Sequence, residues 1–199
     1  MCWTTRIAKA GAFVVGMAIG HATAEDCPDA RAGNAGYVVE RGAGSRTEVF
    51  HDGHTVRTVV RYSGNQVLET TQFEGLFDLD RIDRGRRTTF KPASELAKLF
   101  PLKVGQKAVV DFEVMNAGTS AKRTVRLNVV GTDELYIGSC KYKVLKIERS
   151  QSQDGKPMVF LEIDYYSPEL KLIIAKEFKE GRGQTSLNKF DKIYLPANR

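Results

Sequence analysis

The sequence predicts an all-β protein whose mainly antiparallel strands curl into a half-open barrel or a sandwich, with one short helix. Two observations favour this fold class. Short runs with apolar and polar residues in alternation follow one another along the chain, and turn residues such as Asp-Gly and Ser-Pro separate them. Only one segment has the spacing of an amphipathic helix. Strands at this spacing typically form a sheet closed or folded on itself.

The N-terminus precedes the first strand and has the pattern of a secretory signal peptide. Arg6 and Lys9 give a basic start, residues 10–20 (AGAFVVGMAIG) are apolar, and Ala22-Thr23-Ala24 is a small-x-small cleavage motif. The alternative is a buried N-terminal core helix. We expect cleavage after Ala24, a single β-rich domain at 25–199, and a periplasmic location. No later stretch approaches the roughly 20 apolar residues of a transmembrane helix, so none is expected in the mature chain.

Charge and cysteine content agree with export. Removal of Arg6 and Lys9 leaves 28 basic against 24 acidic residues, so the formal net charge falls from +6 to +4. That mild excess permits contact with anionic envelope polymers but does not indicate nucleic-acid binding. Cys2 leaves with the signal peptide, and Cys27 and Cys140 remain. In an oxidising compartment two cysteines favour one disulfide, the alternative being two separate core thiols.

The first half of the mature chain begins with a hairpin and ends with the helix. Residues 49–56 (VFHDGHTV) place Asp-Gly between β-prone flanks, and residues 54–62 alternate as a strand with one solvated face. Residues 93–100 follow, with Ser94 as N-cap, leucines on one side and Pro101 as a stop. Strands before and after this helix are expected to share one core.

The second half reads as strand after strand. Residues 123–130 alternate, 140–148 and 157–166 are joined by a turn with Asp154-Gly155, and 170–178 and 186–195 follow. Between two of these runs stands the stretch Tyr165, Tyr166, Ser167, Pro168, Glu169 and Leu170. Because proline cannot donate to a sheet ladder, this stretch predicts a corner between strands. A lone carboxylate, Glu169, is weak support for a reactive site.

Several of these segments together resemble a known family. They are PLKVGQ (101–106), VVGTDEL (129–135), the GSCKYKVLKIE strand and DYYSPELKLIIAKE (164–177). This combination is similar to the DUF3108 type of bacterial, alphaproteobacterial-type periplasmic β-rich proteins of unknown function, with Pro-Leu-x-x-Gly and Tyr-Ser-Pro-Glu-Leu signatures. The resemblance covers roughly residues 100–180 and implies an all-β envelope protein without an established activity.

Motifs for catalysis are missing from the sequence. It contains no Gly-x-Ser-x-Gly, no phosphate-binding glycine-rich loop and no His-Glu-x-x-His. His51 and His54 would face each other across a two-residue hairpin, but a zinc site needs three or four ligands. We therefore expect no catalytic residue, no metal and no cofactor.

One charged run is a candidate binding surface. It holds Arg81, Arg84, Arg86, Arg87 and Lys91, interleaved with three aspartates. Arginine suits bidentate contact with phosphate or carboxylate, whereas the alternative is a solvated loop with internal ion pairs.

Three functions remain in order of preference. The first is a soluble periplasmic envelope protein that binds an envelope component or a protein partner without chemistry. The second is a carrier with a lipophilic ligand in an apolar cavity, for which the short helix and Phe73, Phe77 and Phe112 would form the lining. The third is an uncharacterised hydrolase.

Overall fold

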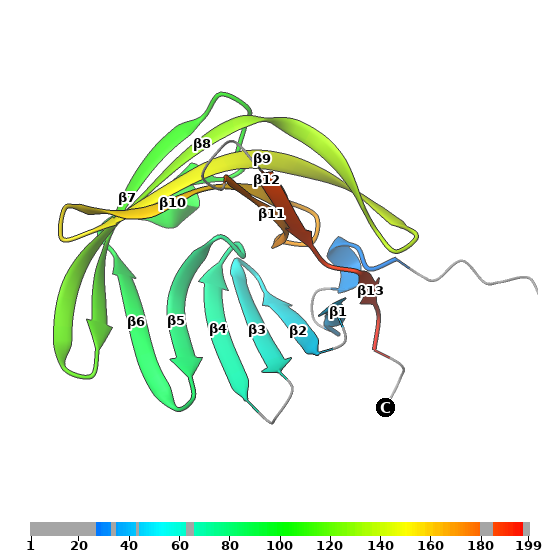
Figure 1. Ribbon diagram of the computed structural model, residues 1–199, viewed down its shortest axis with the longest axis horizontal. Coiled ribbons are helices and arrows are strands. Elements are labelled where there is room, and N and C mark those ends of the chain that lie inside the picture. The colour runs from blue at the N-terminus through cyan, green and yellow to red at the C-terminus, as the bar shows by residue number, and fades with distance from the viewer. Residues whose placement is uncertain (1–26, 33–34, 43, 63–65, 180–184, 197–199) are drawn as a thin grey trace, which may run out of the picture.

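Thirteen antiparallel strands form one continuous sheet in the part of the chain that the computed structural model describes, residues 27–32, 35–42, 44–62, 66–179 and 185–196. Figure 1 shows the sheet bent into an arch, with β1 to β6 as one wall and β7 to β12 passing over it. The strands are β1 (Tyr37–Arg41), β2 (Ser45–Asp52), β3 (Thr55–Tyr62), β4 (Val67–Phe73), β5 (Phe77–Asp83), β6 (Arg86–Pro92), β7 (Lys107–Asn116), β8 (Thr119–Ile137), β9 (Cys140–Gln153), β10 (Lys156–Ser167), β11 (Leu172–Lys179), β12 (Thr185–Lys189) and β13 (Lys192–Tyr194).

The strand order explains the curled shape. Each strand from β1 to β11 pairs with the next along the chain, whereas β13 pairs with β1 at the opposite edge from β12. The chain therefore crosses from one edge to the other between β12 and β13. Phe190 N–H donates to Ile174 on β11, and Asp191 N–H donates to Glu40 on β1. The two ends of the sheet approach each other without pairing, so the predicted half-open arrangement is confirmed and the sandwich alternative is not adopted.

Bulges supply part of the curvature. The pairing of β8 with β9 shifts register between Val129 and Gly131, and that of β10 with β11 shifts between Tyr165 and Tyr166. A bulge inserts an extra residue in one strand and bends it. The 19-residue strand β8 thereby spans both parts of the arch.

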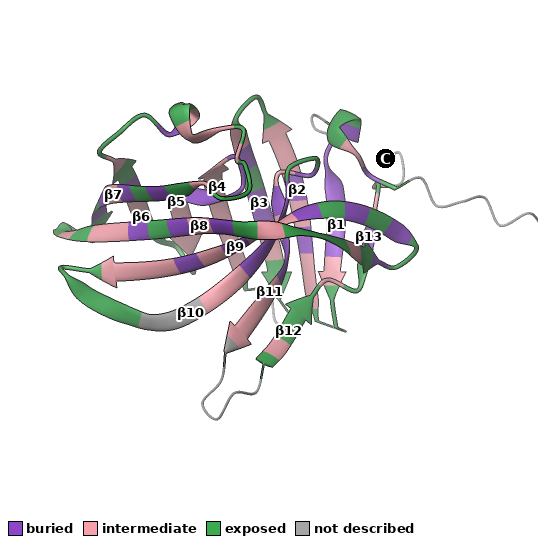
Figure 2. Ribbon diagram, turned by 90° about the horizontal axis from the view of Figure 1, so that it is seen from above, coloured by how far each residue is buried: buried purple, intermediate pink, exposed green. Residues whose placement is uncertain are grey.

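The concave side of the sheet holds the core. Burial alternates along β7 and β8, as Figure 2 shows, with Val110, Val125 and Leu127 among the buried residues. One apolar cluster joins β1 and β2 to the far ends of β8 to β11, and a second joins β5 to β9 and the segment before β7. The two halves of the chain thus build their core together.

The predicted helix at 93–100 is shorter than expected. It is a single 3-10 turn, η2 (Leu96–Leu99), preceded by Glu95 rather than Ser94, and no side chain caps it. The sheet ladder continues beyond β6, since Ala93 N–H donates to Asp111 on β7, which leaves no residues for an earlier turn of helix. Leu96 anchors the segment in the core. No described helix has the length and apolar character needed to cross a membrane.

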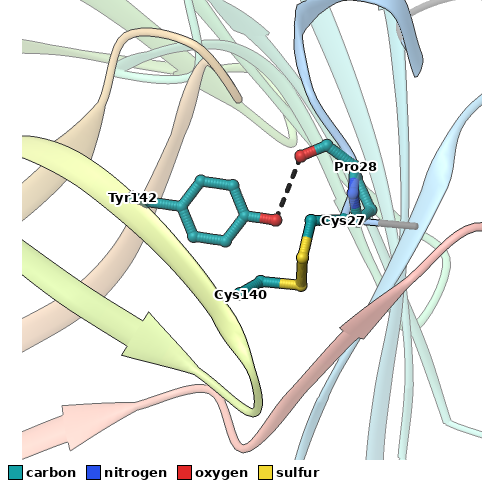
Figure 3. The surroundings of a disulfide bond; sticks show 4 residues. All are labelled: Cys27, Pro28, Cys140 and Tyr142. Atoms are coloured by element: carbon teal, nitrogen blue, oxygen red, sulfur yellow. Dashed lines mark hydrogen bonds between the residues drawn. A yellow bond between two sulfur atoms is a disulfide. The ribbon is translucent and has the colours of Figure 1, made fainter. Parts of the chain in front are cut away.

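A disulfide between Cys27 and Cys140 ties the N-terminal segment to the sheet, as the cysteine count predicted (Figure 3). Beside it, the Tyr142 hydroxyl donates to the Pro28 carbonyl oxygen at 3.0 Å. A 3-10 turn, η1 (Ala30–Ala32), then leads toward β1. The predicted signal peptide and its cleavage site after Ala24 lie outside the described residues.

Candidate functional site

The arginine run of the sequence forms a β-hairpin. Asp83 pairs with Arg86, so Arg84 and Gly85 make a two-residue turn between β5 and β6. Both have positive φ, 50° and 77°, as the type I′ turn that fits the strand twist requires. Arg84 and Arg86 are consequently exposed at the tip.

The alternation of side chains along β6 places the predicted residues on two opposite sides of the sheet. Arg86, Thr88 and Phe90 of β6 lie on the concave side, where they line a pocket together with Arg81 and Arg84. Arg87 and Lys91 alternate with these residues and lie on the convex side. Arg87 Nε donates there to Asp80 Oδ1 at 2.9 Å. Three of the five predicted residues therefore line one pocket, and two do not.

Strand β8 adds a fourth arginine, Arg123, to the pocket. Its guanidinium lies over the Phe90 ring, with Cζ 5.2 Å from the ring centroid. Its Nε is buried and has no hydrogen-bond partner in the described part of the chain. Burial lowers the pKa of Arg123; Asp78 opposes this effect and Arg81 adds to it. The residue remains protonated, since even a lowered arginine pKa stays far above neutrality.

Arg123 is not among the residues that the sequence predicted for this surface. In a strand it lies on the same face as Val125, Leu127 and Val129, so it stands at the end of an apolar face. That position was the available signal: a charged residue on a buried face calls for a partner or a ligand.

The pocket has a volume of about 500 Å³. Its charged lining consists of four arginines and one aspartate, which gives a formal net charge of +3. Asp83 accepts from Arg81 Nη2 at 3.3 Å and lies 3.8 Å from Arg84 Nε, two pairs too exposed to neutralise the site. The rest of the lining is uncharged: Thr88, Asn116, Thr119 and Gln153 are polar, and Phe90, Val114 and Ala121 are apolar.

Behind the pocket the core is tightly filled. A cavity of about 30 Å³ shares Phe90 and Arg123 with the pocket and is also lined by Asp78 and Arg149. Phe77, which was expected to line a lipid cavity, packs on Phe112 and Phe100 with ring centroids 6.1 and 6.4 Å apart. A space of this size holds a water molecule or two, not an acyl chain.

Hydrogen bonds hold the corner at residues 165–170 in place. The Tyr166 hydroxyl donates to the Glu74 carbonyl oxygen at 2.9 Å, and Ser167 Oγ accepts from Leu170 N–H at 3.3 Å. Tyr165 donates to Glu177 at 2.9 Å; burial, and after it this hydrogen bond, raises the pKa of Tyr165 to about 12. Leu170 is fully buried, whereas Pro168 and Glu169 are exposed in the turn. The corner joins β10 and β11 to the turn between β4 and β5.

The two hairpin histidines do not face each other. Asp52 pairs with Thr55, so Gly53 and His54 form the turn, and His51 pairs instead with Val56. His54 Nδ1 contacts the Glu74 carboxylate, whereas the ring of His51 lies edge-on to Tyr37. Gly53, with a positive φ of 57°, is the first of the two turn residues, so the turn lies one residue later than the expected Asp52-Gly53 turn. Within the described residues, no three His, Cys, Asp or Glu side chains gather as a metal site.

Comparison with known proteins gives little more. No protein-family model matches the chain, so the DUF3108 resemblance stays a hypothesis, and no curated protein matches it in sequence. Among solved structures, the hypothetical lipoprotein YmcC from Escherichia coli K12 is 11% identical, with 81% of this chain and 87% of that chain covered and a TM-score of 0.48. These comparisons assign the chain to no family and no function.

Proposed function

We propose that this protein is a soluble periplasmic binding module that holds an anionic component of the bacterial envelope in the arginine-lined pocket and performs no chemistry on it. The observation behind the proposal is the convergence of Arg81, Arg84, Arg86 and Arg123 on one pocket with a single acidic residue. Arginine side chains fix the geometry of an anion through paired N–H donors.

Two further observations favour this role over the alternatives. Arginines do not exchange protons at neutral pH, so the pocket is built for holding an anion rather than for acid–base catalysis. The lipophilic carrier would need a largely apolar space of several hundred cubic ångström, whereas the cavity behind Phe90 has about 30 Å³ and the larger pocket is lined mostly by charged and polar residues. The signal-peptide pattern, the disulfide and the DUF3108 resemblance support the periplasmic location.

Retention on a column of immobilised heparin, a sulfated polyanion, tests the proposal. We expect the triple variant Arg81→Ser, Arg84→Ser and Arg86→Ser to elute at a clearly lower salt concentration than the wild type, because charge-assisted contacts are screened by salt. The matched control replaces Arg57, Arg61 and Arg87, which lie outside the pocket, by serine and loses the same net charge. Equal shifts for both triples would show that net charge alone drives retention and would overturn the pocket as the site.

A further inference from the structure

The pocket's arginines differ in their surroundings, which indicates where an anion would lie. Arg84 and Arg86 are exposed at the hairpin tip, and Arg81 donates a hydrogen bond to Asp83. Arg123 stands apart, because its buried Nε has no hydrogen-bond partner among the described residues. Its stacking on Phe90 holds the guanidinium where the pocket meets the small cavity, so Arg123 offers an anion a pre-positioned contact.

A second arginine reinforces this inner end. Arg149 is 9% exposed and lines the small cavity that adjoins Arg123. Its Nε lies 2.7 Å from the buried Asp164 carboxylate, and its Nη2 has no hydrogen-bond partner among the described residues. Asp164 also pairs with Lys176, which in turn pairs with Glu162, both at 3.1 Å, so these two cations are matched by two carboxylates. The charged residues that line this small cavity are therefore Arg123, Arg149 and Asp78, with a formal net charge of +1.

The number of guanidinium groups favours one anion class. A carboxylate has two oxygens and a single charge, which one arginine fork satisfies. A phosphate monoester has three terminal oxygens and a charge of about −1.5 to −2 at pH 7, which needs several donors. Four arginines from two sides of one pocket, with a net charge of +3, match the phosphate better.

The volume of the pocket and its uncharged lining residues indicate which kind of molecule carries the phosphate. The pocket's volume of about 500 Å³ lies within the range for sites that hold organic molecules and exceeds what a lone phosphate fills. Thr88, Asn116 and Gln153 offer uncharged donors and acceptors of the kind that hydroxyl groups require. Phe90 is covered on one face by Arg123, which leaves little apolar surface for a chain.

We infer that the pocket binds a phosphate monoester of a hydroxyl-bearing carbon skeleton, with the phosphate against Arg123 and the hydroxyl groups toward Asn116 and Gln153. This inference rests on the proposed function, since it specifies the anion that the same pocket holds. The phosphate is free or belongs to a lipid headgroup, and the chemistry that the pocket recognises is the same.

Calorimetric titration of the mature protein with glucose 1-phosphate and with glucuronate, which carry a phosphate and a carboxylate on hexose skeletons, tests the inference. We expect glucose 1-phosphate to bind at least about tenfold more tightly than glucuronate and more tightly than inorganic phosphate. Arg123→Gln should weaken glucose 1-phosphate about 10- to 100-fold, whereas Arg87→Gln, on the convex side, should leave the affinity unchanged. Arg86→Gln, exposed at the tip, should also weaken binding and guards against a folding defect of Arg123→Gln.

Titration with dihexanoyl phosphatidate, a soluble lipid that carries a phosphate monoester, distinguishes a lipid headgroup from a free phosphate ester. Tighter binding of this lipid than of glucose 1-phosphate would assign a headgroup, and weaker binding a free phosphate ester; each outcome supports the shared chemistry. Equal affinity for glucose 1-phosphate and glucuronate, or an Arg123→Gln variant that binds like the wild type, would overturn the inference. If heparin retention still depends on the pocket in that case, the proposed function stands and only the phosphate assignment falls.

Discussion

His51 shows how a single side chain couples this fold to pH. Its Nε2 is buried without a hydrogen-bond partner in the described structure, and its ring packs edge-on against Tyr37 at 5.6 Å. Burial lowers the pKa of His51 below its usual 6.5, and the nearby Lys171 lowers it further, whereas Glu74 and the Leu170 backbone oppose these effects. The folded protein therefore takes up a proton at this site less readily than the unfolded chain.

The expected consequence is a loss of stability in weak acid. With a depressed folded-state pKa, the stabilising contribution of neutral His51 is present above about pH 6.5 and is lost as the pH falls through the folded value. Urea unfolding between about pH 8 and pH 5 should show this decline, and His51→Gln should flatten it. His54→Gln is the control, since that side chain is 64% exposed and bonded to Glu74. An unchanged slope in His51→Gln would contradict the prediction.

At the scale of elements, two turns hold the arch together. The turn between β4 and β5 lies against the turn between β10 and β11, where Lys171 Nζ donates to Glu74 Oε1 at 3.1 Å and to the Gly53 carbonyl oxygen at 2.7 Å. Gly75 has a φ of 67°, and a Cβ atom there would lie 1.7 Å from the Lys171 carbonyl oxygen. The backbones thus approach so closely that only glycine fits.

Gly75→Ala should destabilise the protein by more than the strain of its positive φ accounts for. Strain at a positive φ costs about 1–2 kcal/mol, and the clash with Lys171 adds a displacement of the turn, so we expect a loss above about 2 kcal/mol. Gly155→Ala is the matched control, because Gly155 also has a positive φ, 76°, but no atom within 4 Å of its Cβ position. Equal losses for the two variants in urea unfolding would show that the contact between the turns contributes nothing.

The elements also show what sequence alone predicts. Alternation located the strands from 54 to 62 and from 123 to 178, because a half-buried sheet imposes a period of two on local sequence. It did not reveal that β8 runs for 19 residues through a bulge, since that length depends on the pairing of β8 with both β7 and β9. The corner at 165–170 was predictable from Ser167-Pro168, whereas its hydrogen bond to Glu74 depends on a partner 92 residues away.

The pocket belongs to the scale of the whole molecule. Local sequence identified Arg81, Arg84 and Arg86 because they are close along the chain and share a hairpin. Arg123 joins them only because β6 pairs with β7 and β7 with β8, and because the sheet curves enough to bring its concave residues together. Such a site is a property of strand order and curvature, which composition and periodicity do not determine.

The disulfide and the pocket lie in different parts of the same sheet, and this separation gives the last prediction. Cys140 belongs to the apolar cluster of β1 and β2 with the far ends of β8 to β11, whereas the pocket adjoins the cluster of β5 to β9. The bond spans 113 residues of sequence, so it restricts the unfolded chain strongly. Replacement of both cysteines by serine should lower the free energy of unfolding by about 2–4 kcal/mol.

Binding at the pocket should survive that loss. The arginine hairpin and β8 keep their pairing partners without Cys27, so the double-serine variant should elute from heparin at the wild-type salt concentration while it unfolds at lower urea. Wild-type protein treated with dithiothreitol provides the matched comparison, because it loses the same bond without a change of sequence. Simultaneous loss of retention and stability, at a temperature where the variant is still folded, would show that the two clusters act as one unit. An unchanged urea midpoint would show that the hydrogen bond from Tyr142 to Pro28 and the sheet alone hold the N-terminal segment in place.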